Sequence, residues 1–219
     1  MKPRGVSVTP LQIAIDGPAA SGKTTVARRV AARLQLAYLD TGAMYRALAY
    51  LALETHANVR DGNALAALVD RANAQRYSEA LLQSNDVNAV VSIVAAHPEV
   101  RETMVAAQRR IAGDESVVMA GRDIGTVVLP NAPVKIYLTA SVDARVDRRR
   151  MQLEAAGANV DAAQLRQELE RRDRLDRTRA VSPLEPARDA HVIDSSDLSV
   201  EQVVDAVGAI VARARAVTS

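Results

Sequence analysis

The chain has 219 residues, of which 48% are hydrophobic and 25% are charged, and its formal net charge is +2. This composition is typical of a globular protein and excludes a disordered or collagen-like chain. The absence of cysteine excludes disulfide frameworks and thiolate metal sites. No apolar run approaches the roughly 18 residues of a membrane span, and the first ten residues lack an apolar signal core, so we expect a cytoplasmic protein.

The first predicted strand and helix flank a phosphate-binding loop. An apolar run predicts a strand at residues 11–15, and a helical pattern covers residues 23–36. Between them, GPAASGKT matches every fixed position of the P-loop pattern GxxxxGK[ST]. The glycines let backbone N–H groups turn toward phosphates, Lys23 neutralises the β- and γ-phosphates, and Thr24 offers a hydroxyl to Mg²⁺. The predicted triphosphate site comprises Gly17, Pro18, Ala19, Ala20, Ser21, Gly22, Lys23, Thr24 and Thr25.

A second polar group lies between a predicted strand at residues 37–39 and a predicted helix at residues 42–54. The sequence DTGAMYR places the hydroxyl of Thr41 near Tyr45 and Arg46 at the start of this helix. Its position after a sheet strand favours a second ligand site. The alternatives are that Thr41 only caps the helix and that Tyr45 and Arg46 are surface residues.

The middle of the chain is predicted to be mostly helical, with helices at residues 85–96 and 98–111. Residues 61–86 show mixed helical and irregular character, and their structure is left open. A strand follows at residues 117–120 and leads into the loop GRDIGT. There, Arg122 could clamp a phosphate and Asp123 could accept hydrogen bonds from a nucleoside, although a tight turn with an ion pair explains both equally well.

A fourth site lies on a predicted helix at residues 161–179. Arg172, Asp176 and Arg179 are spaced by four and three residues and so share one helix face. Two arginines beside a carboxylate suit a phosphorylated substrate, whereas a solvated helix with ion pairs is the alternative. Arginines also crowd the preceding helix, at residues 140–156, and a lid that closes over a triphosphate explains their density. They are Arg145, Arg148, Arg149 and Arg150.

Further strands at residues 134–138 and 191–193 and a last helix at residues 200–216 complete the alternation of strands and helices. This alternation predicts an α/β protein with three layers, in which a parallel five-stranded sheet is flanked by helices on both faces. Ligands in such folds bind beyond the carboxyl ends of the strands, which is where the first three polar groups lie.

Four segments together resemble the bacterial cytidylate kinase family: DGPAASGKTT, LDTGAMYR, GRDIGTVVLPNAPVKIYLTAS and RRDRLDRTRAVSPL. They occur in the family's order and span most of the chain. The resemblance implies a P-loop NTPase fold with a helical lid and a small, shortened substrate-binding insert. It implies in-line transfer of the γ-phosphate of ATP to CMP or dCMP with Mg²⁺, which gives ADP and CDP or dCDP. We further expect a monomer that binds neither nucleic acid nor membrane.

The resemblance also implies a division of the single domain, residues 1–219. The core comprises residues 11–40, 113–140 and 187–217. The CMP-binding region comprises residues 41–112, with the insert at residues 61–86, and the lid comprises residues 145–182.

Residue roles follow from the same resemblance. Arg145 and Arg149 resemble lid arginines that bind ATP, whereas Thr24 holds Mg²⁺ mostly through ATP and water. The residues expected to take part in the transfer are Lys23, Arg122, Asp123 and Arg172. The residues expected to bind CMP are Thr41, Tyr45, Arg46, Ser92, Arg101, Arg122, Asp123, Arg172, Asp176 and Arg179. In this set Tyr45, Ser92 and Arg101 lie at the base.

The chain departs from the family at two places. Ala120 stands where the family usually has an acidic residue. If that acid organises Mg²⁺ or its water shell, Asp16 or Asp123 has to replace it. Residues 70–86 are also shorter and less strand-like than the family's insert, which normally carries a small antiparallel sheet.

Two other functions fit part of the pattern. One is a different small-molecule P-loop kinase, acting on another nucleoside monophosphate or on a shikimate-like metabolite. The other is a non-catalytic nucleotide- or RNA-binding module, which is supported only by the slightly basic composition and by Ala120. Against it, the chain has no Phe or Trp and only five Tyr, so it offers few surfaces on which bases could stack.

Overall fold

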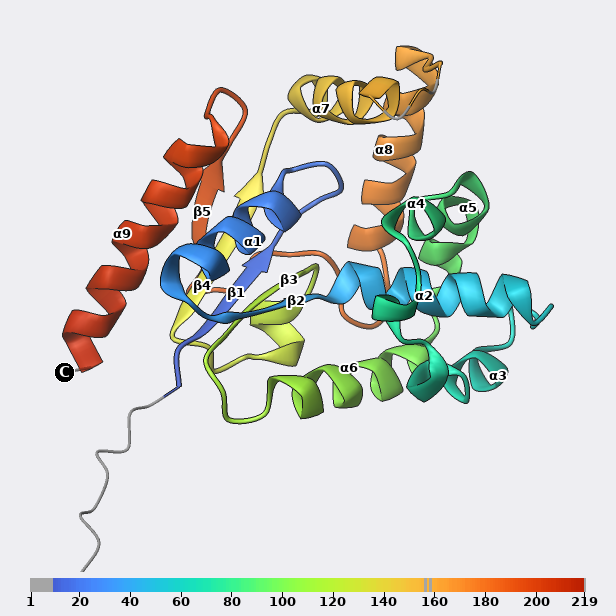
Figure 1. Cartoon of the computed structure of the whole chain (residues 1–219), viewed down its shortest axis with the longest axis horizontal. Helices are drawn as coiled ribbons and strands as arrows, with labels where there is room; N and C mark the ends of the chain where they lie inside the picture. Colours follow the sequence, from blue (N-terminus) through green and yellow to red (C-terminus); the bar gives the residue numbers. More distant parts are fainter. Residues whose placement is uncertain (1–9, 156, 158, 219) are drawn as a thin grey trace, which may run out of the picture.

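Five strands form the central sheet, in the order β2-β3-β1-β4-β5, and every neighbouring pair is parallel. The computed structural model describes residues 10–155, 157 and 159–218 (Figure 1). Residues 1–9 of the expected domain, the last residue of the helix expected at 140–156, and residue 219 lie outside the described residues. The strands are β1 Gln12–Asp16, β2 Ala37–Asp40, β3 Val117–Gly121, β4 Val134–Thr139 and β5 His191–Asp194.

Helices occupy most of the remaining described chain. The α-helices are α1 Lys23–Leu34, α2 Thr41–Glu54, α3 Gly62–Ala66, α4 Glu79–Leu82, α5 Asn85–Val94, α6 Pro98–Ala112, α7 Val142–Ala155, α8 Ala162–Arg177 and α9 Val200–Thr218. Two short 3₁₀ helices, η1 Val69–Arg71 and η2 Ala74–Arg76, and one π-helical turn, η3 Ile124–Val128, complete the elements. No helix of the described chain is long and apolar enough to cross a membrane.

Both faces of the sheet are covered, which makes the fold a three-layer α/β structure. Successive strand residues point to opposite faces, and both faces of β1 are buried. Ile13 packs on one side with Val30 of α1 and Val207 of α9. Ala14 packs on the other side with residues of β3, α6 and η3. The expected parallel five-stranded sheet between helical layers is therefore confirmed.

A second apolar cluster lies beside the sheet, where α2, α3, α5 and α6 pack together (Figure 1). Leu48, Leu65, Val87 and Met104 are each at most 1% exposed in this cluster. The segment left open at residues 61–86 contributes α3, η1, η2 and α4 to it, and this described segment contains no strand. Short helices therefore occupy the segment whose structure the sequence left open.

Helices α7 and α8 form a hairpin above the carboxyl ends of the strands (Figure 1). Its apolar contacts are made by Val146 of α7 and by Leu165 and Leu169 of α8, which cluster with Ala19 of the P-loop. The hairpin therefore packs directly against the loop that follows β1. The other expected elements begin and end within one or two residues of the observed bounds.

Candidate active site

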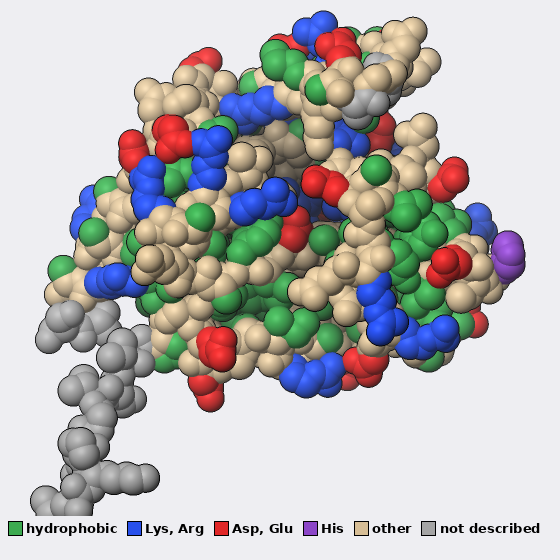
Figure 2. Space-filling model, viewed as in Figure 1, with side chains coloured by type: hydrophobic (Ala, Val, Ile, Leu, Met, Phe, Trp, Pro, Cys, Tyr) green, Lys and Arg blue, Asp and Glu red, His purple; other side chains and the backbone are tan. Residues whose placement is uncertain are grey.

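A cavity of about 860 Å³ lies where the carboxyl ends of β1, β2 and β3 meet the α7–α8 hairpin. The P-loop follows β1, the DTGAMYR segment begins at the end of β2, and the GRDIGT segment begins at the end of β3. In a parallel sheet these ends lie on one edge, so three segments distant in sequence line one cavity. Figure 2 shows the surface hollowed below the α7–α8 hairpin, with basic and acidic side chains at the opening.

The P-loop keeps its shape because its glycines occupy positions that other residues could not. A Cβ at Gly17 would lie 2.1 Å from the carbonyl oxygen of Leu138. Gly22 has a φ of 88°, a left-handed conformation that favours glycine, and α1 begins directly after it. The loop therefore directs the first N–H groups of a helix toward the cavity, which is a site for anions.

Lys23 is only 8% exposed, and its Nζ donates to the carbonyl of Pro18 at 2.9 Å. Burial, together with the nearby positive charge of Arg122, lowers the pKa of Lys23 well below its ordinary value. The hydroxyl of Ser21 is buried and has no partner among the described residues. A lysine whose charged form is disfavoured by burial and a hydroxyl without a hydrogen-bond partner would both be satisfied by a bound polyphosphate.

The two arginines expected to bind ATP from the lid both have protein partners in this structure. Arg145 is buried, pairs with Asp173 at 2.7 Å and donates to the carbonyl of Ala19 at 3.2 Å, so it holds α8 and the P-loop together behind the cavity. Arg149 lines the cavity and donates at 2.9 Å to Oε1 of Gln83, the residue that follows α4.

Arg148, on α7, is the arginine that contacts the end of the cavity formed by the P-loop. It donates to the carbonyl of Ser21 at 3.4 Å, to Oγ of Ser195 at 3.0 Å, and to the carbonyl of Ser195. Because Ser195 follows β5, Arg148 joins the lid, the P-loop and the last loop of the sheet. Arg148 belongs to the arginine-rich helix found in the sequence, but no motif distinguished it from its neighbours.

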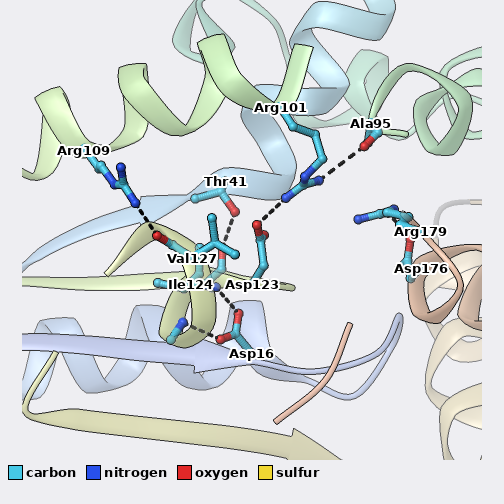
Figure 3. Close-up of polar contacts among 12 residues, drawn as sticks. Asp16, Thr41, Ala95, Arg101, Arg109, Asp123, Ile124, Val127, Asp176 and Arg179 are labelled. Atoms are coloured by element: carbon cyan, nitrogen blue, oxygen red, sulfur yellow. Dashed lines mark hydrogen bonds and ion pairs between the residues drawn. The ribbon is translucent and has the colours of Figure 1, made fainter. Parts of the chain in front are cut away.

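The far end of the cavity is formed by α2, α5, α6 and the end of β3. Arg101 is 2% exposed, pairs with Asp123, and donates to the carbonyl of Ala95 at 3.3 Å (Figure 3). Its guanidinium lies 5.5 Å from the ring centroid of Tyr45. Burial would lower the pKa of Arg101, but Tyr45 and Asp123 raise it. This end combines an aromatic ring with a fixed charged pair and also includes Ser92.

Arginines gather between the two ends. Arg122 donates from Nε to Asp176 at 2.8 Å, and Arg179 also pairs with Asp176. Burial opposes ionisation of Asp176, but these arginines outweigh it and lower the pKa of that carboxyl.

The Nε atoms of Arg46 and Arg172 are buried and have no hydrogen-bond partner among the described residues. Burial, with help from Arg46 and Arg122, lowers the pKa of Arg172 to about 9. Burial likewise lowers the pKa of Arg46. Nearby carboxylates offset these shifts only in part, so this part of the cavity is suited to an anionic group.

Two residues of the second segment have fixed local roles. The side chain of Asp40, not that of Thr41, caps α2, since its Oδ1 accepts from the N–H of Ala43 at 3.1 Å. The interpretation of Thr41 as the helix cap is therefore wrong. Thr41 is 3% exposed, and its hydroxyl donates to the carbonyl of Ala120 at 2.8 Å.

The two acids suggested as replacements at position 120 are engaged elsewhere. Asp16 is 4% exposed and accepts from the N–H groups of Ile124 and Gly125, both at 2.8 Å (Figure 3). Burial raises the pKa of Asp16 to about 6. Asp123 pairs with Arg101 at the opposite end of the cavity.

Most of the residues expected from the sequence meet in this cavity. Those that line it are Ala19, Ala20, Ser21, Gly22, Lys23, Thr24, Thr25, Thr41, Tyr45, Arg46, Ser92, Arg101, Arg122, Asp123, Arg149, Arg172, Asp176 and Arg179. Gly17, Pro18 and Arg145 shape it without lining it. Lining residues that the sequence did not assign to a site include Asp40, Gln83, Ser195 and Leu198, and Arg148 was indicated only as one of four arginines that crowd its helix. Only Asp40 and Arg148 belong to segments that the sequence singled out.

The cavity wall near the P-loop carries few oxygen atoms that could bind a metal ion. Within the described residues, no group of three or more His, Cys, Asp or Glu side chains could hold an ion. The hydroxyl of Thr24 and the carboxylate of Asp40 are hard oxygen donors on the cavity wall. Such a sparse oxygen set fits Mg²⁺, which keeps several waters and is held largely by substrate phosphates.

Comparison with protein-family models finds that the model described as cytidylate kinase matches residues 13–213. A cytidylate kinase of Geobacillus sp. (strain WCH70) is 47% identical over 215 residues, which cover 92% of this chain and 96% of the relative. A cytidylate kinase of Nocardia farcinica (strain IFM 10152) is 46% identical over 220 residues, which cover 94% and 95% of the two chains.

Solved structures agree with the fold. A gluconokinase from Sinorhizobium meliloti 1021 aligns with a TM-score of 0.51 at 15% identity, over 94% of this chain and 93% of that chain. An uncharacterized protein from Eubacterium ventriosum ATCC 27560 aligns with a TM-score of 0.55 at 12% identity, over 92% and 98%. At such low identity these likenesses concern the fold alone.

Proposed function

The chain belongs to the cytidylate kinase family and is an ATP-dependent kinase of CMP or dCMP, and from this premise we propose which of its residues carry out the transfer. One observation supports the proposal most strongly: Arg46 and Arg172, each with a buried Nε that has no hydrogen-bond partner among the described residues, share a cavity with Lys23. One phosphorylated ligand on the P-loop and a second one on the arginines would both be bound by unsatisfied cations.

We assign the donor end to ATP. Lys23 would exchange its bond to the carbonyl of Pro18 for the β- and γ-phosphates, and Ser21 would gain the partner that its hydroxyl lacks. Arg148, which already links the P-loop to Ser195, would hold the lid over the nucleotide. Mg²⁺ at Thr24, when bound, neutralises charge on the phosphates.

We assign the far end to CMP or dCMP. Tyr45 would lie against the cytosine, with Ser92 and Arg101 at the base edge. Asp176, held by two arginines, would accept hydrogen bonds from the sugar, aided by Arg179. The phosphate would then reach the guanidinium groups of Arg46, Arg122 and Arg172. Thr41 and Asp123 would support this pocket through their bonds to Ala120 and Arg101.

The chemistry needs no covalent nucleophile. A phosphate monoester is largely ionised near neutral pH, so its oxygen can attack the γ-phosphorus in line without a strong base. Lys23, Arg122 and Arg172 would offset repulsion between the two anions and stabilise charge on the transferred group. Closure of α7 and α8 would exclude water and limit hydrolysis of ATP.

The organisation of the chain follows the same proposal. The sheet with residues 11–40, 113–140 and 187–217 would form the rigid core, residues 41–112 the CMP-binding region, and residues 145–182 the lid. We propose a cytoplasmic monomer that acts on small molecules and does not bind nucleic acid. Membership of a kinase family argues against a binding module without catalysis.

The test is a coupled assay of ADP release with Mg²⁺ and ATP against CMP, dCMP, UMP, AMP, GMP and shikimate. We expect release with CMP or dCMP and little with the others. Lys23→Ala provides the blank, because it removes the phosphate-binding amine while leaving the rest of the cavity. ADP release that follows another acceptor better than CMP or dCMP would overturn the assignment of the acceptor end.

A further inference from the structure

Asp40 accepts a hydrogen bond from the P-loop hydroxyl that the proposed function gives to Mg²⁺. It is the last residue of β2, and its Oδ2 lies 3.5 Å from Oγ1 of Thr24. Both residues line the cavity. The other carboxylate oxygen, Oδ1, accepts from the N–H of Ala43 and caps α2. One oxygen of Asp40 therefore fixes the helix, while the other is directed toward the P-loop.

Four of the other acids around the cavity are used for other contacts, while a fifth, Glu168 of α8, lines the cavity and acts on Arg149 and Arg172 by its charge. Asp16 is bound to two backbone N–H groups, Asp123 pairs with Arg101, and Asp176 pairs with two arginines. Glu79, on α4, accepts from the side-chain amide of Gln83. Among the acids that line the cavity in the described chain, Asp40 is the one with a hydrogen bond to a P-loop side chain.

The neighbouring strand explains why this position matters. Asp40 of β2 and Ala120 of β3 are register partners in the sheet. Ala120 brings no charge to the cavity wall, although it lines the cavity next to Asp40. A negative charge beside Thr24 is thus supplied by the end of β2 rather than by the end of β3.

The electrostatic surroundings agree with this geometry. Burial and nearby arginines lower the pKa of Lys23, whereas the charge of Asp40 opposes that shift. Asp40 likewise opposes the lowering of the pKa of Arg46 by burial. The charge of Asp40 therefore acts on cations of both the P-loop and the arginine cluster.

We propose that Asp40 is the positioning residue for Mg²⁺, acting with Thr24 by holding a water of the ion's shell. This inference rests on the proposed use of Mg²⁺ at the P-loop. Carboxylates that orient metal ligands from outside the first coordination shell contribute strongly to metal affinity. The competing explanation is that Asp40 only caps α2.

The two explanations are separated by Asp40→Asn. Asparagine caps helices about as well as aspartate, so the variant should keep the cap but lose the charge. Mn²⁺ serves as a spectroscopic substitute for Mg²⁺, and its binding to the protein with a non-hydrolysable ATP analogue is followed by electron paramagnetic resonance. We expect the affinity for Mn²⁺ in this complex to fall roughly 10- to 100-fold, while metal-free nucleotide binding and the melting temperature change little.

A matched control is Asp61→Asn. Asp61 caps α3 through the N–H of Ala64 and does not line the cavity, so its replacement should leave Mn²⁺ binding unchanged. A second test adds the charge back with Asp40→Asn combined with Ala120→Asp, which should restore part of the lost affinity because the two positions are register partners.

Wild-type Mn²⁺ affinity in Asp40→Asn would overturn the proposal and leave Asp40 as a cap alone. Failure of the wild-type complex to bind Mn²⁺ at all would also overturn it. The proposed function is tested separately by acceptor-dependent ADP release from the wild-type protein. A wild type that phosphorylates CMP while Asp40→Asn binds Mn²⁺ normally would therefore refute the inference about Asp40 and leave the kinase assignment intact.

Discussion

Asp16 shows how burial makes one carboxylate respond to pH. Its pKa is raised from an ordinary 3.8 to about 6 by burial, although two N–H groups favour the ionised form. A raised pKa in the folded state means that its contribution to stability is complete below about pH 4 and is lost as the pH rises through 6. The loss amounts to about 2 to 3 kcal/mol, at 1.36 kcal/mol for each pKa unit.

The variant Asp16→Asn cannot titrate, so it should lack this loss. We expect the free energy of unfolding of the wild type, minus that of the variant, to fall by about 2 to 3 kcal/mol between pH 4 and pH 7. Urea unfolding at several pH values measures this difference, and the slope with pH matters rather than the absolute stability. Parallel curves for the two proteins would contradict the prediction.

Arg148 is expected to affect the binding of ATP but not that of CMP. Arg148→Ala removes donors to Ser21 and Ser195, and hydrogen bonds from a charged group contribute about 1.5 to 3 kcal/mol each. We expect the KM for ATP to rise at least about tenfold, which corresponds to 1.4 kcal/mol, while the KM for CMP stays nearly constant.

Arg150→Ala is the control for Arg148→Ala. Arg150 lies on the same helix, pairs with Asp147, and does not line the cavity. Steady-state kinetics with each substrate varied in turn provides the comparison. An equal rise of both KM values in Arg148→Ala would indicate a general disturbance of the lid rather than a donor contact.

At the scale of elements, the lid is joined to the insert by Gln83. Its Oε1 accepts from Arg149 at 2.9 Å and from the amide of Gln152 at 3.2 Å, so α4 is linked to α7 across the cavity. We expect Gln83→Ala to favour the open lid, which should raise hydrogen exchange of the α7 amides and the hydrolysis of ATP without CMP.

The matched control is Gln75→Ala, an exposed glutamine of η2 in the same insert that does not line the cavity. Hydrogen exchange followed by mass spectrometry, together with ADP release in the absence of CMP, tests the link. Unchanged exchange in α7 after Gln83→Ala would show that apolar packing of the hairpin, rather than this amide, determines closure.

The same elements show what the sequence could and could not predict. The strands were found within one residue, because buried parallel strands are continuous apolar runs such as Val117–Gly121. Residues 61–86 were left open because their helices have three to five residues, too few for a helical period. Their shape depends on caps such as Asp61 and Ser78 and on packing against α2 and α6.

The residues of the candidate site likewise fall into those with a local sequence motif and those without one. The P-loop and the arginine clusters have local motifs and could be identified from the sequence. Gln83 and Ser195 have no motif, and they reach the cavity only because α4 and the end of β5 are brought there by the fold. Arg148 lines the cavity whereas Arg145 pairs with Asp173 outside it, because helix α7 turns different faces to the P-loop and to α8, and sequence spacing alone does not fix those faces.

At the scale of the whole molecule, the positive charges of arginines in the cavity lower the stability of the free protein. The charges of nearby carboxylates offset the burial of Arg46 and Arg172 only in part, and burial of Arg172 lowers its pKa to about 9. A folded-state pKa below the ordinary value of arginine means that the charged form is disfavoured by folding at neutral pH. The free protein is therefore less stable than its packing allows, and a bound anion should recover that stability.

Arg172→Met tests this trade between stability and function. The variant keeps an unbranched apolar side chain and removes the buried charge, so we expect the free energy of unfolding of the free protein to rise by about 1 to 2 kcal/mol. CMP at 100 times its dissociation constant should stabilise the wild type by about 2.7 kcal/mol and the variant much less. The variant's kcat/KM for CMP should fall at least about 100-fold, which corresponds to the 2.7 kcal/mol scale of one charged contact.

The control is Arg171→Met, because Arg171 is the exposed neighbour on α8 and does not line the cavity. Thermal unfolding with and without CMP measures both effects, and a variant that is destabilised when free yet still stabilised by CMP would show that Arg172 supports α8 rather than binding the acceptor.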